Sequence, residues 1–327
     1  MKEFMTINLQ LFANTVQTTL LEGLAPENKT FYDMNLIDEA TPNLIHDQFG
    51  QKRPIPKNGG KKIEFRKFAS LPKALTPLTE GVTPDGKKLS VSSIEAEVAQ
   101  YGDYIVQSDV LELTSIDNTI VEATKILGNQ AGLTLDTITR NVLHSGTNVY
   151  YCPKADGTVV ASRETLDDTC KLTVDVIKRA VAIMKKNNAP KINGDYVAII
   201  HPFAAYDLMS DPAWIEAHKY ATPENIYEGE IGKVAGVRFV ESSEAKIYAG
   251  GVFGTLLIAD GAYGVTEITG GGLQTIIKQL GSAGTADALN QRSSIGWKAI
   301  KTAEILVEPY LMRIESKSAF SGDAEAN

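Results

Sequence analysis

Histidines are the residues whose chemistry would show first in this sequence, because imidazole serves both as a general base and as a metal ligand. The chain has four, at His46, His144, His201 and His218. None lies three to five residues from another, so no pair has the spacing of a local zinc site. His201 follows an apolar run and precedes Pro202, which predicts a packed histidine at the end of a strand rather than a catalytic one.

Motifs for nucleophilic catalysis and phosphate binding are the next features to test. The chain contains no G-x-S-x-G element, which marks the nucleophile of many hydrolases. The glycine triplet Gly270–Gly272 is not followed by G-K-[ST] or by a predicted helix, as a phosphate-binding loop requires. We therefore expect no enzyme and no cofactor, and we assign no catalytic, cofactor-binding or metal-binding residue.

The isolated carboxylates and thiols have plain structural interpretations. Asp136, Asp175 and Asp207 fall on the predicted surfaces of helices and need no functional role. The two cysteines, Cys152 and Cys170, match no metal motif. We expect them to be free thiols in a reducing compartment.

An uneven charge distribution is the strongest signal in the chain. The protein is acidic, with a formal net charge of -8. Residues 51–90 nevertheless carry ten Lys or Arg against Glu64, Glu80 and Asp85, a balance of +7, so the remainder carries -15. The candidate residues for contacts between subunits are eight cations of this ribbon: Lys57, Lys61, Lys62, Arg66, Lys67, Lys73, Lys87 and Lys88.

Three interpretations of the basic ribbon follow from the residues alone. A DNA-binding arm would neutralise phosphates with Lys and Arg and wedge a proline into a base step, although the -15 remainder would repel a duplex. A ribbon that lies on an acidic neighbouring copy would use opposite charge to fix register and partner. The third interpretation is an exposed, solvated hairpin. We favour the second.

The basic ribbon is predicted to form two strands of a hairpin. Alternation in "KKIEFRKF", with Ile63 and Phe65 on one face, predicts a strand, and a second strand is expected from about Leu89. The prolines and glycines between them predict a loose tip. A change of phase at Ser92–Ser93 predicts a bulge. An isolated two-stranded hairpin is marginal in water, so the long hairpin at 57–100 must rest on another surface.

A long helix is expected after the hairpin, and an arm before it. Apolar residues step by three or four from Leu113 to Val142, which predicts an amphipathic helix of about 28 residues, roughly 42 Å long. Thr114 and Asp117 resemble a capping box at its start. Residues 1–56 are expected to form an extended arm with a helical piece near 34–47.

The pattern changes to alternating helices and strands from about Leu166. We expect a helix from Thr173 to Pro190, a buried strand in "DYVAIIHP", two short helices around Pro212 and further strands up to Ser316. The small, acidic tail at 317–327 is expected to be frayed. No run of about 18 apolar residues occurs, so we expect no membrane span.

The order of these elements resembles that of the major capsid proteins of tailed bacteriophages, which have the Hong Kong 97-like fold. Three stretches carry the resemblance: "DYVAIIHPFAAYDLMSDPAW" at 195–214, "EGEIGKVAGVRFVESS" at 228–243 and "LNQRSSIGWKAIKTAEIL" at 289–306. The third is most similar to the phage N4-type branch. The opening "INLQLFA" also resembles the starts of many proteins of the phage capsid region.

The resemblance implies an α+β fold with five regions. These would be an N-terminal arm at 1–56, the extended β-hairpin loop at 57–100, a peripheral domain with the spine helix at 101–165 and 291–316, an axial domain at 166–290 and the tail at 317–327. It also implies a major capsid protein that self-assembles into hexamers and pentamers of an icosahedral head. That head would enclose double-stranded DNA without sequence-specific contacts.

The remaining partners and locations are also implied by the resemblance. The first is a portal protein. Because the arm is too short for a fused scaffolding segment, scaffolding, if needed, would come from a separate protein or from processing that has already taken place. The protein would lie in the virion, and in the host cytoplasm before assembly. We expect no covalent cross-link, because the loop lysines have no identifiable reaction partners. Two alternative functions are an encapsulin-like nanocompartment shell and a DNA-binding protein that uses the hairpin as an arm.

Overall fold

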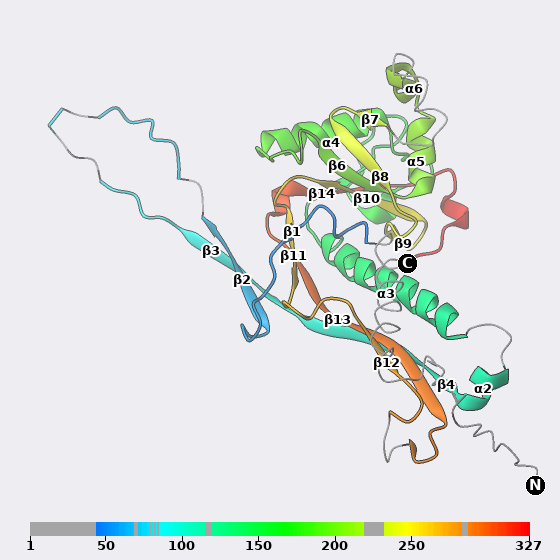
Figure 1. Cartoon of the computed structure of the whole chain (residues 1–327). Helices are drawn as coiled ribbons and strands as arrows, with labels where there is room; N and C mark the ends of the chain where they lie inside the picture. Colours follow the sequence, from blue (N-terminus) through cyan, green and yellow to red (C-terminus); the bar gives the residue numbers. More distant parts are fainter. Residues whose placement is uncertain are drawn as a thin grey trace, which may run out of the picture.

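Two β-sheets and a projecting hairpin organise the chain in the computed structural model (Figure 1). The structure describes residues 44–68, 71–78, 80–81, 83, 85–114, 119–218, 232–282 and 287–327. The helical piece expected at 34–47 lies mostly outside these residues, and 46–49 at its end form a turn. No helix in the described ranges is both long enough and apolar enough to cross a membrane.

One sheet has seven strands, and its central strands are buried on both faces. The strand order is β5–β14–β10–β6–β8–β7, with β9 paired to one end of β10. The bounds are β5 Val149–Tyr151, β6 Tyr196–Ile200, β7 Lys233–Val234, β8 Val237–Glu241, β9 Ile247–Tyr248, β10 Val252–Ile258 and β14 Leu311–Ser316. Every residue of β6 and β10 is buried, which explains the continuous apolar runs in both segments.

Three helices belong to this part of the chain: α4 (Val174–Lys186), α5 (Pro202–Met209) and α6 (Pro212–His218). All three confirm the prediction. The side chain of Thr173 caps α4 by accepting a hydrogen bond from the N–H of Val176. The buried face of α4, including Ile177, packs in one core with Ile200 of β6.

The second sheet has five strands and carries the long helix on one face. The strands are β1 Gln51–Lys52, β4 Ala99–Ser108, β11 Tyr263–Glu267, β12 Gln274–Lys278 and β13 Arg292–Ile305. Strand β4 pairs with one edge of β13, while β11 and β12 pair with successive parts of the same strand. The apolar stripe of helix α3 (Thr119–Leu143), including Leu127 and Ala131, packs on Ile295 and Trp297 of β13.

The long helix is described over a shorter range than the sequence pattern predicts. Helix α2 (Asp109–Thr114) follows β4 directly, and α3 is described from Thr119 onwards. The predicted capping box cannot be compared with the structure, because Asp117 lies outside the described ranges and Thr114 is the last described residue before 115–118. The apolar stripe from Ile120 onwards is confirmed.

The hairpin forms as predicted, but without the bulge. Strands β2 (Lys62–Phe68) and β3 (Val91–Glu97) pair antiparallel in an unbroken register through Ser92 and Ser93. The bulge prediction is wrong because Leu89 lies before the strand and Val91, its first residue, lies on the exposed face at 51% exposure, so one regular strand accommodates both phases. The break comes instead at Val98, between β3 and β4, where its N–H donates to the Lys61 carbonyl at 3.0 Å.

Sheet membership cuts across the regions expected from the sequence. Strands β11 and β12, expected within 166–290, join the five-stranded sheet through β13. Strand β14, expected with the spine helix, lies in the seven-stranded sheet between β10 and β5. The chain therefore passes between the two layers several times, and no single cut separates them.

The C-terminal tail is docked rather than frayed, so that prediction is wrong. The Phe320 ring stacks on Phe203 of α5 with centroids 4.8 Å apart. The Asn327 side chain accepts a hydrogen bond from the Ile247 N–H at 2.9 Å and donates to the Ala245 carbonyl at 3.3 Å. One aromatic residue and one terminal amide thus fix a segment that its composition suggested was loose.

Candidate assembly surface

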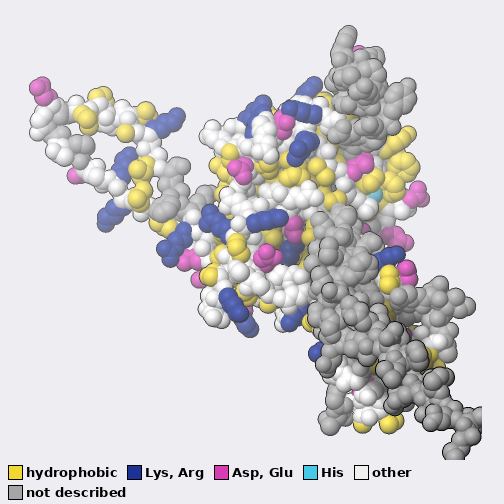
Figure 2. Space-filling view, viewed as in Figure 1, with side chains coloured by type: hydrophobic (Ala, Val, Ile, Leu, Met, Phe, Trp, Pro, Cys, Tyr) yellow, Lys and Arg dark blue, Asp and Glu magenta, His cyan; other side chains and the backbone are white. Residues whose placement is uncertain are grey.

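The distal part of the hairpin projects from the body with no cover from the described chain (Figure 1). Leu75, Leu78 and Leu89 are 82%, 76% and 68% exposed, although leucine usually lies inside a protein. Figure 2 shows hydrophobic and basic side chains interspersed along this projection. Several exposed leucines held away from the body are typical of a site that another molecule covers.

The base of the hairpin, by contrast, is fixed to the body. Phe65 and Ala96 are 5% and 3% exposed. A Cβ at Gly264 would lie only 2.9 Å from Cζ of Phe65, so glycine at this point of β11 leaves the room that the ring occupies. The Arg53 guanidinium lies 6.0 Å from the centre of the same ring. The hairpin therefore has a buried base and an exposed tip.

The structure distributes the predicted contact residues along the hairpin and does not gather them in one pocket. Seven are exposed, and the side chain of Lys67 lies outside the described residues. Lys62 pairs with Glu95 at 3.5 Å, and Arg66 pairs with Glu64 at 3.1 Å. Such exposed pairs contribute about 0–1 kcal/mol each. The hydrogen bond from Arg66 lowers the pKa of Glu64.

The exposed leucines are the part of this surface that the sequence interpretation missed. Leu71, Leu75 and Leu78 lie in the stretch whose prolines and glycines predict only a loose tip. The available signal was three leucines within eight residues of a segment with no strand alternation. Apolar side chains at that density on a loop indicate a contact surface, because loops without partners are usually polar.

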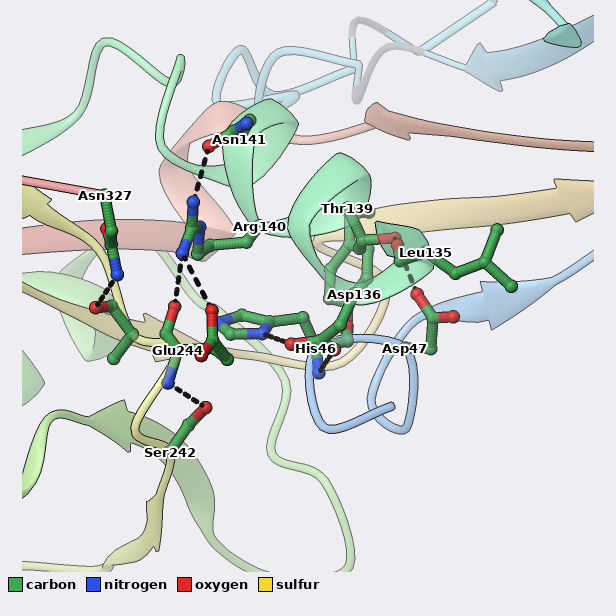
Figure 3. Close-up of polar contacts among 12 residues, drawn as sticks. His46, Asp47, Leu135, Asp136, Thr139, Arg140, Asn141, Ser242, Glu244 and Asn327 are labelled. Carbon is green, nitrogen blue, oxygen red and sulfur yellow. Dashed lines mark hydrogen bonds and ion pairs between the residues drawn. The ribbon is translucent and has the colours of Figure 1, made fainter. Parts of the chain in front are cut away.

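The root of the N-terminal segment is clamped to α3 by buried polar contacts (Figure 3). The backbone N–H and ring Nδ1 of His46 lie 2.7 and 2.6 Å from the two carboxylate oxygens of Asp136. Neither side chain is exposed. Next along the chain, Asp47 accepts from the Thr139 hydroxyl at 2.6 Å and pairs with Lys301 of β13. Five polar side chains, four of them buried, thus join the segment, the helix and the sheet.

Two carboxylates expected on helix surfaces are therefore buried, and that prediction is wrong for Asp136 and Asp207. Asp207 is 7% exposed; it accepts from the Ala319 N–H at 3.1 Å and lies 3.4 Å from Lys171 Nζ. Asp175 is exposed as expected. No local spacing signals these contacts, because His46 lies 90 residues from Asp136, and Ala319 and Lys171 lie 112 and 36 residues from Asp207.

His144 lies close to the same clamp, at the C-terminal end of α3. Its Nδ1 is 3.0 Å from the hydroxyl of Tyr248. Burial, and then the electrostatic effects of His46, Arg313 and Arg140, hold the pKa of His144 well below its usual value. The ring is therefore neutral near pH 7 and packs as part of the interior.

Comparisons with known proteins extend this description beyond the hairpin. Residues 136–282 match the family described as phage capsid protein. Solved structures with a similar fold include the capsid of cyanophage Pam1, with a TM-score of 0.65, 13% identity and coverage of 86% of this chain and 92% of that one. The capsid of cyanophage P-SCSP1u has a TM-score of 0.64 and 15% identity, with coverage of 83% of this chain and 87% of that one. The capsid of Ralstonia phage GP4 has a TM-score of 0.62 and 16% identity, with coverage of 85% of this chain and 89% of that one.

The family match and the fold agree. Residues 136–282 are similar to the phage capsid protein family, and the chain has the mixed α+β, Hong Kong 97-like fold of these capsid structures. No curated protein matches its sequence.

The other predicted histidine and the two cysteines have structural roles. His201 accepts a hydrogen bond from the Phe203 N–H at 3.1 Å at the start of α5, which confirms a packed histidine at a strand end. Cys152 and Cys170 are buried free thiols, and burial raises the pKa of both. The described residues contain no His, Cys, Asp and Glu group suited to a metal ion.

Proposed function

We propose that the chain is a phage major capsid protein, and that it builds hexamers and pentamers in which the hairpin of each subunit lies over a neighbouring copy. The supporting observation is the contrast between the buried base at Phe65 and the exposed leucines at the tip. Burying one such leucine stabilises a contact by about 1.5–3 kcal/mol. Many such contacts in a closed shell add up through multivalency, while each alone is weak enough to be corrected.

The two sheets fit different roles in such a shell. We assign the seven-stranded sheet with α4, α5 and α6 to the axial domain, around which copies would meet at ring centres. The five-stranded sheet with α3 as the spine helix would form the peripheral domain. The segment before residue 57 would be the N-terminal arm, held at its root by the His46–Asp136 contact. The stretch at 289–306 supports placement in the N4-type branch.

The charge distribution supports an enclosed double-stranded DNA that the subunit does not grip by sequence. Outside residues 51–90 the chain carries -15, which disfavours tight binding of a duplex to the body. A portal protein and a separate scaffolding protein would complete the head. The eight cations of the hairpin, from Lys57 to Lys88, would then face an acidic neighbour and fix its position.

Electron microscopy of the purified protein in negative stain tests this function. Capsomers, sheets or closed shells are the expected result, with or without a scaffolding protein. A strictly monomeric species under all assembly conditions contradicts the proposal. The DNA-binding alternative is tested separately by titrating duplex DNA at several salt concentrations. Tight binding with a steep salt dependence that Lys61→Glu with Arg66→Glu abolishes would favour that alternative.

A further inference from the structure

We propose that the exposed tip of the hairpin docks on helix α2 of the neighbouring copy. This assignment rests on the proposed function, because it names the surface of the neighbour that the hairpin covers. The tip is defined here as the described residues within 71–89, and the acceptor as Asp109–Leu113. Both surfaces carry exposed apolar side chains, and the lysines of the tip are opposite in charge to the carboxylates of α2.

The two surfaces lie at opposite ends of the molecule. Strands β3 and β4 follow each other directly from Val91 to Ser108, with the hairpin tip before them and α2 after them. In Figure 1 the hairpin projects to one side, and α2 lies at the opposite, lower end. A contact between one end of a subunit and the other end of the next is heterologous, and such contacts generate rings or extended arrays. A subunit cannot satisfy this contact by itself.

Helix α2 is apolar and acidic on its exposed surface. Val110, Leu111 and Leu113 are 61%, 46% and 84% exposed. Asp109 and Glu112 lie in its first turn, and its six residues include no Lys or Arg. Large apolar side chains usually lie inside a protein, so three exposed ones on a single short helix indicate a surface that a partner covers.

The position of α2 is fixed by its own start. The Leu111 N–H donates to Ser108 Oγ at 3.2 Å, and the Asp109 N–H donates to the Gln291 carbonyl at 3.1 Å. These bonds satisfy N–H groups that a helix start leaves unpaired. They also tie the helix to the beginning of β13. The apolar surface is therefore presented by an anchored element.

The hairpin tip has the complementary chemistry. Leu71, Leu75 and Leu78 supply apolar surface, and Lys73 and Lys88 supply positive charge with no ion pair to a described residue. Docking on α2 would bury the leucines against Val110, Leu111 and Leu113. It would also bring the lysines near Glu112, where opposite charge selects the register.

Another exposed acidic surface, the loop at 153–168, fits the tip less well. It presents Val159, which is 82% exposed. Two of its carboxylates already have cations from this chain, since Asp167 lies 2.8 Å from Lys154 Nζ and Asp168 lies 3.7 Å from Lys317 Nζ. It offers a single large apolar side chain where α2 offers three. This loop serves as the comparison site in the test.

Cysteine cross-linking of assembled shells tests the docking. The double variant Leu75→Cys with Leu113→Cys, treated with diamide, should give a ladder of covalent multimers on a non-reducing gel. A ladder requires head-to-tail contacts, because either single variant can form dimers at most. The matched control is Leu75→Cys with Val159→Cys, which should give no ladder. The native cysteines stay silent because both are buried.

A charge exchange provides a second readout if a cysteine variant fails to fold. Lys88→Glu and Glu112→Lys should each lower the yield of shells by about tenfold, corresponding to about 1.4 kcal/mol. The two together should restore it. The docking on α2 is overturned if the ladder appears with Val159→Cys and not with Leu113→Cys. It is also overturned if the two charge substitutions together do not restore the yield of shells. Either result leaves the shell function intact. Absence of any assembly by the unmodified chain overturns both.

Discussion

His46 and Asp136 lie 90 residues apart in the sequence, yet Nδ1 of the one and Oδ2 of the other are 2.6 Å apart, with neither side chain exposed. Removing one partner leaves an uncompensated buried polar group. We expect Asp136→Ala to lower the free energy of unfolding by about 3–5 kcal/mol, measured by urea denaturation. The matched control is Asp175→Ala on the exposed side of α4, which should change it by about 0.5 kcal/mol or less. Equal effects of the two substitutions would contradict the clamp.

The low pKa of His144 predicts a loss of stability in mild acid. Its pKa in the folded protein lies below that of the unfolded chain, so the unfolded state binds the proton first. The contribution is complete above about pH 6.5 and declines as pH falls, by up to about 1.4 kcal/mol per pH unit, until the folded pKa is reached. Urea denaturation between pH 7 and pH 5 measures this. His144→Gln should flatten the profile over that range, and an unchanged slope in this variant would assign it to other groups.

The buried base of the hairpin predicts a local effect at Phe65. Phe65→Ala removes the ring that fills the space beside Gly264, so the hairpin should detach while the two sheets stay folded. Hydrogen exchange should rise at least tenfold in 62–68 and 91–97 with little change in β6 and β10, because local opening is governed by local contacts. Phe65→Leu, which keeps an apolar side chain, should have a smaller effect. Uniform loss of protection would show that the base belongs to the core.

The docked C-terminus predicts that the last residues stabilise the fold. Phe320→Ala should lower the free energy of unfolding by about 1–3 kcal/mol, since an aromatic pair adds about 0.5–1.5 kcal/mol to the area that it buries. Thermal unfolding measures the change. Glu325→Ala, at an exposed position of the same tail, is the control and should have no effect. If the tail were frayed, neither substitution would change the free energy of unfolding.

Local patterns in the sequence were enough to predict the elements. Alternation around Phe65 predicted the hairpin, and three- and four-residue steps predicted most of α3. Thr173 marked the start of α4, and Pro190 set a limit shortly after its end. These features depend on residues close in sequence, where propensity and periodicity act directly.

Contacts between distant residues could not be predicted in the same way. The His46–Asp136 pair, the entry of β14 into the seven-stranded sheet and the docking of Asn327 on Ile247 each join segments far apart in the chain. No local spacing encodes them. At the candidate assembly surface, the lysines were found by counting charge, whereas the leucines were missed because their exposure depends on the three-dimensional arrangement.

The proposed shell requires the hairpin to complete its packing on a neighbouring subunit. Deletion of residues 71–88 tests this requirement, with thermal unfolding and electron microscopy of assembly reactions for the variant and the intact protein. We expect a folded subunit with an unfolding midpoint close to that of the intact protein and no closed shells. Shells as abundant as those of the intact protein, or a variant that no longer folds, would contradict it.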